Sequence, residues 1–363
     1  MEGRKDPPVD TLVKLFQCDN CGQPLYFENT RCERCGSALG YVASRAELLS
    51  LEPAAPGWRA KVTPELWFGS CANARYEACN WLVPADSDGM PCPACQYNRT
   101  VPDLSDADNL ARFRSLQRAK HRLFYALFRW GLRPANRIED PQHGLAFDFL
   151  AEQGDGMPVM TGHADGLITI SAAEAESAEC ELRRCTMGET YRTLLGHFRH
   201  ESGHFFWDTL VSGGPRLDAF RALFGDERRD YGAAVEAHYK DGPPVDWQHD
   251  FVSAYATTHP WEDFAETWAH LLHIVDTLET ASAFGIAIRP AVGSAPQTEI
   301  DPAFDPYCAS IDDLIERWLP LAFAVNSLNR SMGQPDLYPF VLSDRVIRKL
   351  VFVRSLMPPP DAL

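Results

Sequence analysis

Apolar side chains recur every three or four residues over residues 105–130, and this spacing predicts an amphipathic helix. Asp106 and Asp108 fall in its first turn and Gly131 follows its end, as helix capping and the helix dipole favour. Between residues 111 and 133 the chain has seven Lys or Arg and no acid. This basic face is either a solvated outer surface or a surface that binds a partner or a membrane. The apolar positions are Leu110, Phe113, Leu116, Leu123, Phe124, Leu127 and Phe128.

Short apolar runs and longer helical patterns follow this first helix. Residues 145–150 and 159–170 predict strands, separated by a turn-rich segment. Helical spacing recurs at 188–211, 217–224, 227–238, 260–278, 311–328 and 342–356, while 285–302 predicts a loop. Before residue 105 the patterns are short, and the Pro and Gly residues of 45–64 indicate a linker. Few strands followed by many helices predict an α+β fold.

Composition and charge narrow the classes of function. The chain has 363 residues, 45% of them hydrophobic, which allows two domains or one large domain with an appendage. Its net charge of −16 disfavours nucleic acid as a main partner, because phosphate is bound mainly by Lys and Arg. The N-terminus has no apolar signal-peptide region, and no apolar run approaches a membrane span. We therefore expect a soluble cytoplasmic protein that does not contact a membrane.

One motif within the predicted helix 188–211 carries candidate chemistry. His200 and His204 frame Glu201 in the pattern H-E-x-x-H. On a helix the two histidines share one face and can bind a single zinc ion, while Glu201 can take a proton from water. The alternative is a pair of buried histidines that only form hydrogen bonds in a packed helix. Leu210 occupies the position where the extended motif has a third histidine, so a third ligand must come from elsewhere.

A second predicted helix offers that ligand. Glu262 and Glu266 lie four residues apart on one face of the helix that begins at Pro260. One glutamate can bind zinc and the other can orient a ligand histidine. Tyr255, seven residues before Glu262, is either a hydrogen-bond donor to a developing oxyanion or an ordinary core aromatic residue.

The cysteines form two sets. Two Cys-x-x-Cys pairs, each followed by glycine, have the spacing of a zinc ribbon, in which four thiolates hold one metal ion. A second set has one irregular pair and one further Cys-x-x-Cys pair, and we expect a second structural zinc there. The first set is Cys18, Cys21, Cys32 and Cys35, and the second is Cys71, Cys79, Cys92 and Cys95. Cys180, Cys185 and Cys308 have no fourth partner, so we expect free thiols or a Cys180–Cys185 redox pair.

The segments HESGHFFWD and SAYATTHPWEDFAETWAH, together with the cysteine sets, resemble the zinc-binding metallopeptidases of bacteria that carry an N-terminal zinc ribbon. More distantly, the spacing from Tyr255 through Glu262 to Glu266 looks like the third-ligand helix of the anthrax lethal factor catalytic domain. That resemblance implies Glu262 as third zinc ligand, Tyr255 as oxyanion stabiliser and Glu266 as the group that orients a ligand histidine. Asp263 departs from it, since an aromatic residue is usual there.

The resemblance implies a zincin-like metallopeptidase domain, with a small sheet, an active-site helix and a helical C-terminal part, behind N-terminal zinc-ribbon modules. The expected division is a zinc ribbon at 1–44, a linker and second four-cysteine module at 45–104, and the peptidase domain at 105–363. The expected function is hydrolysis of peptide (amide) bonds by a zinc-activated water with Glu201 as general base. The gluzincin-type site would hold one catalytic Zn²⁺ ion, and the two cysteine sets would hold two structural Zn²⁺ ions. The alternative is a non-catalytic interaction scaffold that binds a protein partner through its zinc ribbons.

Further side chains near these motifs have expected roles as well. The strand around residues 162–166 is a candidate sheet edge along which a peptide or protein substrate could lie, by analogy with zinc peptidases. We expect structural or surface roles for most of the other histidines, with His270 as the exception that can support Glu266. Asp208 either orients His204 or is a plain surface carboxylate. The histidines concerned are His163, His197, His270 and His273.

Overall fold

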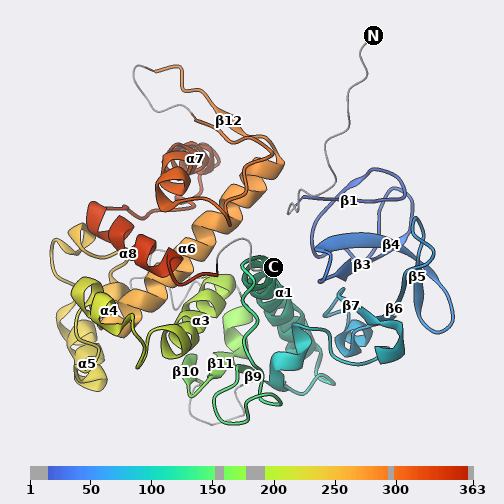
Figure 1. Cartoon of the computed structure of the whole chain (residues 1–363), viewed down its shortest axis with the longest axis horizontal. Helices are drawn as coiled ribbons and strands as arrows, with labels where there is room; N and C mark the ends of the chain where they lie inside the picture. The colour runs from blue at the N-terminus through green and yellow to red at the C-terminus, as the bar shows by residue number, and fades with distance from the viewer. Residues whose placement is uncertain (1–14, 152–158, 177–192, 293–297, 359–363) are drawn as a thin grey trace.

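The computed structural model describes residues 15–151, 159–176, 193–292 and 298–358. These residues form a mixed α/β structure with seven α-helices and four sheets, in which a β-rich N-terminal part adjoins a mainly helical remainder (Figure 1). The mixture of strands and helices agrees with the prediction from the sequence pattern. Among the described residues, no helix combines the length and the apolar character that crossing a membrane requires.

Most of the N-terminal strands form one antiparallel sheet. Its five strands neighbour one another in chain order, and a separate two-stranded hairpin precedes them. The prediction of a linker at 45–64 is wrong, because β4 and β5 lie there and Gly57 allows the turn between them with a φ of 112°. The hairpin is β1 (Phe16–Gln17) and β2 (Pro24–Leu25), and the sheet is β3 (Ala38–Val42), β4 (Glu47–Pro53), β5 (Trp58–Ala60), β6 (Trp67–Ser70) and β7 (Leu82–Pro84).

A second sheet lies beneath the helices. Its order is β10-β11-β9-β8, with β8, β9 and β11 parallel and β10 antiparallel at one edge. The segment 159–170, predicted as one strand, is instead a hairpin that turns at Asp165 and Gly166, both with positive φ. The strands are β8 (Asn98–Thr100), β9 (Ala146–Leu150), β10 (Gly162–Ala164) and β11 (Leu167–Ser171); β12 (Ala287–Ile288) and β13 (Thr298–Glu299) pair within the predicted loop.

The helices begin at capping residues. The side chains of Asp106 and Thr193 accept hydrogen bonds from backbone N–H groups in the first turns of α1 and α3. Asp230 caps α5 in the same way, so this helix begins at Tyr231 instead of the predicted residue 227. The helices are α1 (Ala107–Arg129), α3 (Leu194–Leu210), α4 (Leu217–Phe224), α5 (Tyr231–Asp241), α6 (Pro260–Ala283), α7 (Ile311–Ser331) and α8 (Asp344–Arg354).

The core joins the two parts of the molecule across α1. Phe27 and Tyr41 of the N-terminal part pack edge-on or tilted against the buried ring of Tyr125. Trp81 stacks on His121 of the same helix at 5.2 Å between ring centroids. Buried apolar side chains therefore run without interruption from the N-terminal part into the helical part. This continuity fixes α1, and with it the sheet on which α3 rests.

Candidate active site

The helices α3 and α6 approach closely where the candidate ligands lie. Gly203 makes this possible, since a Cβ atom there would lie 2.8 Å from the Cα atom of Ala265. The side chain of Trp268 donates a hydrogen bond from Nε1 to the Ser202 hydroxyl at 3.2 Å across the same contact. Small residues at the crossing thus bring the H-E-x-x-H face of α3 against the first turns of α6.

Three donor atoms converge at this crossing. His200 Nε2 and His204 Nε2 are 3.1 Å apart, and Glu262 Oε2 lies 2.9 Å and 3.4 Å from them. Ligands at zinc–nitrogen distances of about 2.0–2.1 Å in a tetrahedron are separated by about 3.3 Å, so these spacings fit one shared ion. All three donors lie within 4.8 Å of one another, which makes the cluster a candidate metal site. We call this cluster the open centre, because its three protein ligands would leave the fourth position of a tetrahedral zinc ion open.

Charge in the open centre also favours a cation. Burial disfavours a charged imidazole, but the carboxylates of Glu262 and Glu266 raise the pKa of His200 well above its ordinary value. Glu266 accepts a hydrogen bond from His200 Nδ1 at 2.6 Å. In a neutral His200 this contact puts the ring proton on Nδ1, so the lone pair that can bind a metal ion is on Nε2, which faces Glu262 and His204. The buried carboxylates therefore attract positive charge and fix the imidazole orientation that a metal ion requires.

Glu201 lies on α3 between the two histidines and is 7% exposed. Burial raises the pKa of its carboxyl, and the charges of His200 and His204 act in the opposite direction. A buried carboxylate with a raised pKa is a better proton acceptor near neutral pH than an exposed one. Its position and environment suit a general base.

Tyr255 lies in the short 3₁₀ turn before α6, with its ring centroid 5.8 Å from that of His200. Burial and the negative charge of Glu262 raise the pKa of its hydroxyl far above the ordinary value. The hydroxyl therefore keeps its proton over the physiological pH range and is available as a hydrogen-bond donor.

Tyr231 reaches the open centre although no sequence pattern singled it out. Its hydroxyl donates a hydrogen bond to Glu262 Oε1 at 2.8 Å from the first residue of α5. Trp261 was also missed; its ring lies 3.7 Å, centroid to centroid, from that of His204. In the sequence, Trp261 could have been noticed because it adjoins Glu262. Tyr231 lies 31 residues from Glu262, and no sequence pattern links the two.

The remaining histidines have protein partners outside the three-donor cluster. His163 Nε2 accepts a hydrogen bond from the Gly166 backbone, and its Nδ1 lies 3.8 Å from Asp208 Oδ2. Its ring centroid is 6.2 Å from that of His204, so His163 borders the open centre, while Asp208 contacts His163. His270 Nδ1 accepts a hydrogen bond from the Tyr338 hydroxyl at 2.7 Å. His197 lies 3.5 Å from Glu174, and His273 contacts Arg199.

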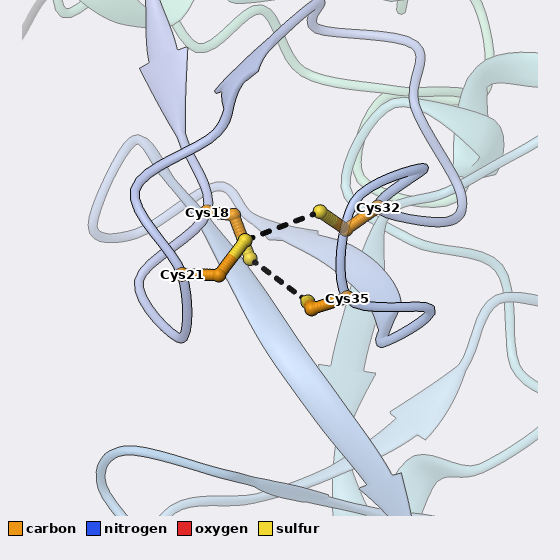
Figure 2. Close-up of side chains that lie close together, drawn as sticks. All are labelled: Cys18, Cys21, Cys32 and Cys35. Carbon is orange, nitrogen blue, oxygen red and sulfur yellow. Dashed lines mark hydrogen bonds between the residues drawn. The ribbon is translucent and has the colours of Figure 1, made fainter.

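The first cysteine set forms a compact cluster on the loops beside β1, β2 and β3. The sulfur atoms of Cys18 and Cys35 are 3.7 Å apart, and those of Cys21 and Cys32 are 3.6 Å apart (Figure 2). Cys21 and Cys35 are partly exposed, whereas the other two are buried. All four sulfurs lie within the mutual distance that one ion requires.

The second cysteine set forms a fully buried cluster of four sulfurs against α1. His121 Nε2 lies 3.5 Å from the sulfur atoms of both Cys79 and Cys95. Burial lowers the pKa of Lys120, while the charges of the four cysteines act to raise it. A protonated Lys120 would offset part of the negative charge that four thiolates and one Zn²⁺ ion would carry. Cys308 is exposed, while Cys180 and Cys185 lie outside the described residues.

Comparison with protein families decides which group this arrangement belongs to. The family described as "Putative zinc-binding metallo-peptidase" matches residues 109–356, about two thirds of the chain. The chain belongs to this metallopeptidase family. A zinc-ribbon domain family matches residues 15–106, which include all eight cysteines of the two clusters.

The metallopeptidase match spans α1 to α8 and includes the open centre. Curated relatives include uncharacterized proteins of Mycobacterium tuberculosis and Mycobacterium bovis, each 43% identical over 346 residues, or 95% of both chains. No solved structure matches the chain. The zinc-binding character of the metallopeptidase family, together with the two four-cysteine clusters, indicates zinc as the metal of this protein.

Proposed function

We propose that this protein is a zinc-dependent peptidase that hydrolyses peptide bonds at the open centre. The single observation that carries the proposal is the convergence of His200, His204 and Glu262 beside the buried carboxylate of Glu201. A structural metal site closes its coordination with four protein ligands, whereas a catalytic zinc site has three and leaves a position for water. The open centre offers three protein ligands, as a catalytic zinc site does. Its third ligand is a glutamate, as in a gluzincin-type site.

Zinc held by these donors would acidify water and polarise the scissile carbonyl group. Glu201 accepts the proton of the attacking water and passes it to the leaving amine. The Tyr255 hydroxyl donates a hydrogen bond to the oxyanion as the carbonyl carbon becomes tetrahedral. Glu266 holds the ring of His200 through Nδ1.

A peptide substrate can bind along β10. This strand lies at the edge of its sheet and contacts α3, the helix that carries Glu201. An edge strand has unpaired backbone groups that can add an extended peptide by main-chain hydrogen bonds. A zincin-like placement of substrate between this edge and α3 would align the scissile bond with the open centre.

The test compares metal content and peptide cleavage in variants. Glu201→Gln should keep three zinc ions per chain and lose about 10²- to 10⁴-fold of the cleavage rate on a mixed peptide library, because the base is gone. His200→Ala should lower the zinc content from three to two. Glu316→Gln, at an exposed position of α7, is the matched control and should keep both properties.

Two results would contradict the proposal. Full cleavage by Glu201→Gln would show that another group acts as the base. Three zinc ions with no cleavage of any peptide by the wild-type chain would favour the interaction scaffold instead.

A further inference from the structure

The helix α5 contacts the open centre although it buries none of its residues. Its first residue, Tyr231, is 42% exposed, yet the hydroxyl of Tyr231 ends on Glu262, which is 1% exposed. The ring of Tyr231 packs against those of His259 and Trp261, at 5.4 and 5.9 Å between ring centroids, and this packing holds the side chain in place. Its hydrogen bond to Glu262 adds a polar contact with a candidate metal ligand.

That hydrogen bond gives the two oxygen atoms of the Glu262 carboxylate different partners. Oε1 accepts the proton of the Tyr231 hydroxyl at 2.8 Å, while Oε2 faces His200 Nε2 and His204 Nε2. A carboxylate can bind a metal ion through one oxygen or through both. A donor on Oε1 removes that oxygen from competition for the ion.

We propose that Tyr231 is a positioning residue that holds Glu262 as a one-oxygen metal ligand and so keeps a coordination position open for water. The inference rests on the proposed metal site of the open centre. It assigns to α5 a role in shaping that site from outside the two ligand helices. Tyr231 acts through Glu262, whose Oε1 accepts the hydrogen bond of its hydroxyl.

The segment before Tyr231 is anchored in a way that supports this role. His259 Nδ1 accepts a hydrogen bond from the backbone N–H of Trp261, so the proton of this imidazole is on Nε2. His259 Nε2 in turn donates to the Arg229 carbonyl at 3.1 Å. Asp230 then caps α5 by accepting from the Ala233 N–H at 2.9 Å. The start of α6 thereby fixes where α5 begins, and Tyr231 falls opposite Glu262.

The far end of α5 lies beside the other tyrosine of the site. The His238 and Tyr255 ring centroids are 5.9 Å apart, and His238 Nδ1 lies 3.4 Å from the Thr257 hydroxyl. The helix therefore spans the open centre from Glu262 to the turn that carries Tyr255.

The test measures metal binding at the open centre of the full chain, independently of cleavage. A mild chelator removes the zinc of the open centre while the two cysteine centres keep theirs, which a zinc count of two verifies. Tyr231→Phe should then bind zinc at the open centre about 10- to 100-fold more weakly than the wild type, as loss of a partner that orients a ligand commonly does. Competition with a chromogenic chelator gives this affinity.

Cobalt(II) in the emptied open centre distinguishes positioning from general damage to the fold. Four-coordinate cobalt(II) absorbs visible light more strongly than five-coordinate cobalt(II), so release of Oε1 to the metal should weaken the absorption in Tyr231→Phe. Tyr239→Phe, on the same helix and 56% exposed, is the control and should keep the wild-type affinity and spectrum.

Wild-type affinity and an unchanged cobalt spectrum in Tyr231→Phe would overturn the inference, even if the chain cleaves peptides. A weakened affinity and spectrum in a chain that cleaves nothing would support the inference while contradicting the proposed peptidase function. The two proposals therefore fail separately.

Discussion

The cysteine centres and the open centre hold their candidate ligands in different ways. The cysteines lie on short loops beside strands of only two to five residues, and six of the eight are buried in the local core. The ligands of the open centre lie on α3 and α6, helices of 17 and 24 residues that pack closely along Gly203 and Ala265. Loops this short bury too little apolar surface to fold alone, so we expect a metal ion bound by these cysteines to stabilise them as a core would. Long packed helices need no metal to stay in place.

The second cysteine centre sharpens this contrast, because it also touches the helical part. His121 of α1 lies 3.5 Å from the sulfur atoms of Cys79 and Cys95, and the strand β8 that follows Cys95 pairs with β9 of the sheet beneath α3. Loss of this metal should therefore disturb α1 as well as the ribbon, whereas loss of the open-centre metal should remove function and leave the fold.

The largest expected effect comes from Cys79→Ser. It should lower the zinc content and either prevent soluble folding or lower the melting temperature by at least about 10 °C, because a structural zinc contributes folding free energy directly. Wild-type protein whose open centre has been emptied by a mild chelator should instead keep its helical circular dichroism and a cooperative unfolding transition.

Cys308→Ser is the matched control, since this thiol is exposed. It should keep the zinc content and melt within about 2 °C of the wild type, as surface substitutions usually do. Collapse of the helical signal after emptying the open centre would remove the contrast between the two kinds of site.

Much of this arrangement follows from local patterns in the sequence. The spacing of His200 and His204, and of Glu262 and Glu266, placed each pair on one helical face, and the structure brings the two faces together. Capping by Asp106 and the proline at the start of α6 marked helix ends well. Residues on one face of a helix recur with a period of about 3.6 residues, so the sequence itself shows which of them lie together.

The features that escaped prediction depend on contacts between distant residues. Pro and Gly at 45–64 indicated a linker because the same residue types form hairpin turns, and only pairing with β3 and β6 shows that strands lie between them. Tyr231 bonds to a residue 31 positions away, and His121 lies 42 positions from Cys79. Neither contact has a periodic signature, so the sequence alone could not place these side chains at metal sites.

A buried ion pair in the helical part offers the next test of whether packing alone holds the open centre. Lys349 of α8 donates from Nζ to Asp263 Oδ2 and to the Asp250 carbonyl, both at 2.6 Å. Burial raises the pKa of Asp263, which is fully buried and adjoins Glu262, while Lys349 acts in the opposite direction. Lys349→Met should cost about 3–5 kcal/mol of unfolding free energy, because it leaves a buried carboxyl group without its counter-charge.

Urea unfolding at pH 7 gives this cost, and the double variant Lys349→Met/Asp263→Leu should recover most of it. The zinc content should stay at three in the folded Lys349→Met protein, since none of the ligands changes. A loss of zinc without a loss of stability would show that the ion pair supports the metal site and not the packing of α6 on α8.

The smallest effect concerns His270, which tests how fully the interior of α6 excludes charge. Burial lowers the pKa of its imidazole to about 4, although the nearby charge of Glu266 acts to raise it. In the unfolded chain the pKa is about 6.5, so between these values the unfolded state binds more protons and acid favours unfolding. The contribution to stability is therefore complete above about pH 6.5 and is lost as the pH falls toward 4.

Between pH 7.5 and 5 the loss of unfolding free energy should be about 2 kcal/mol. His270→Gln, which can still hydrogen-bond Tyr338, should show a shallower decline in urea unfolding over this range by that amount. Equal slopes in the two proteins would mean that the imidazole becomes protonated inside the fold, so that packing around α6 tolerates the charge that the open centre is built to attract.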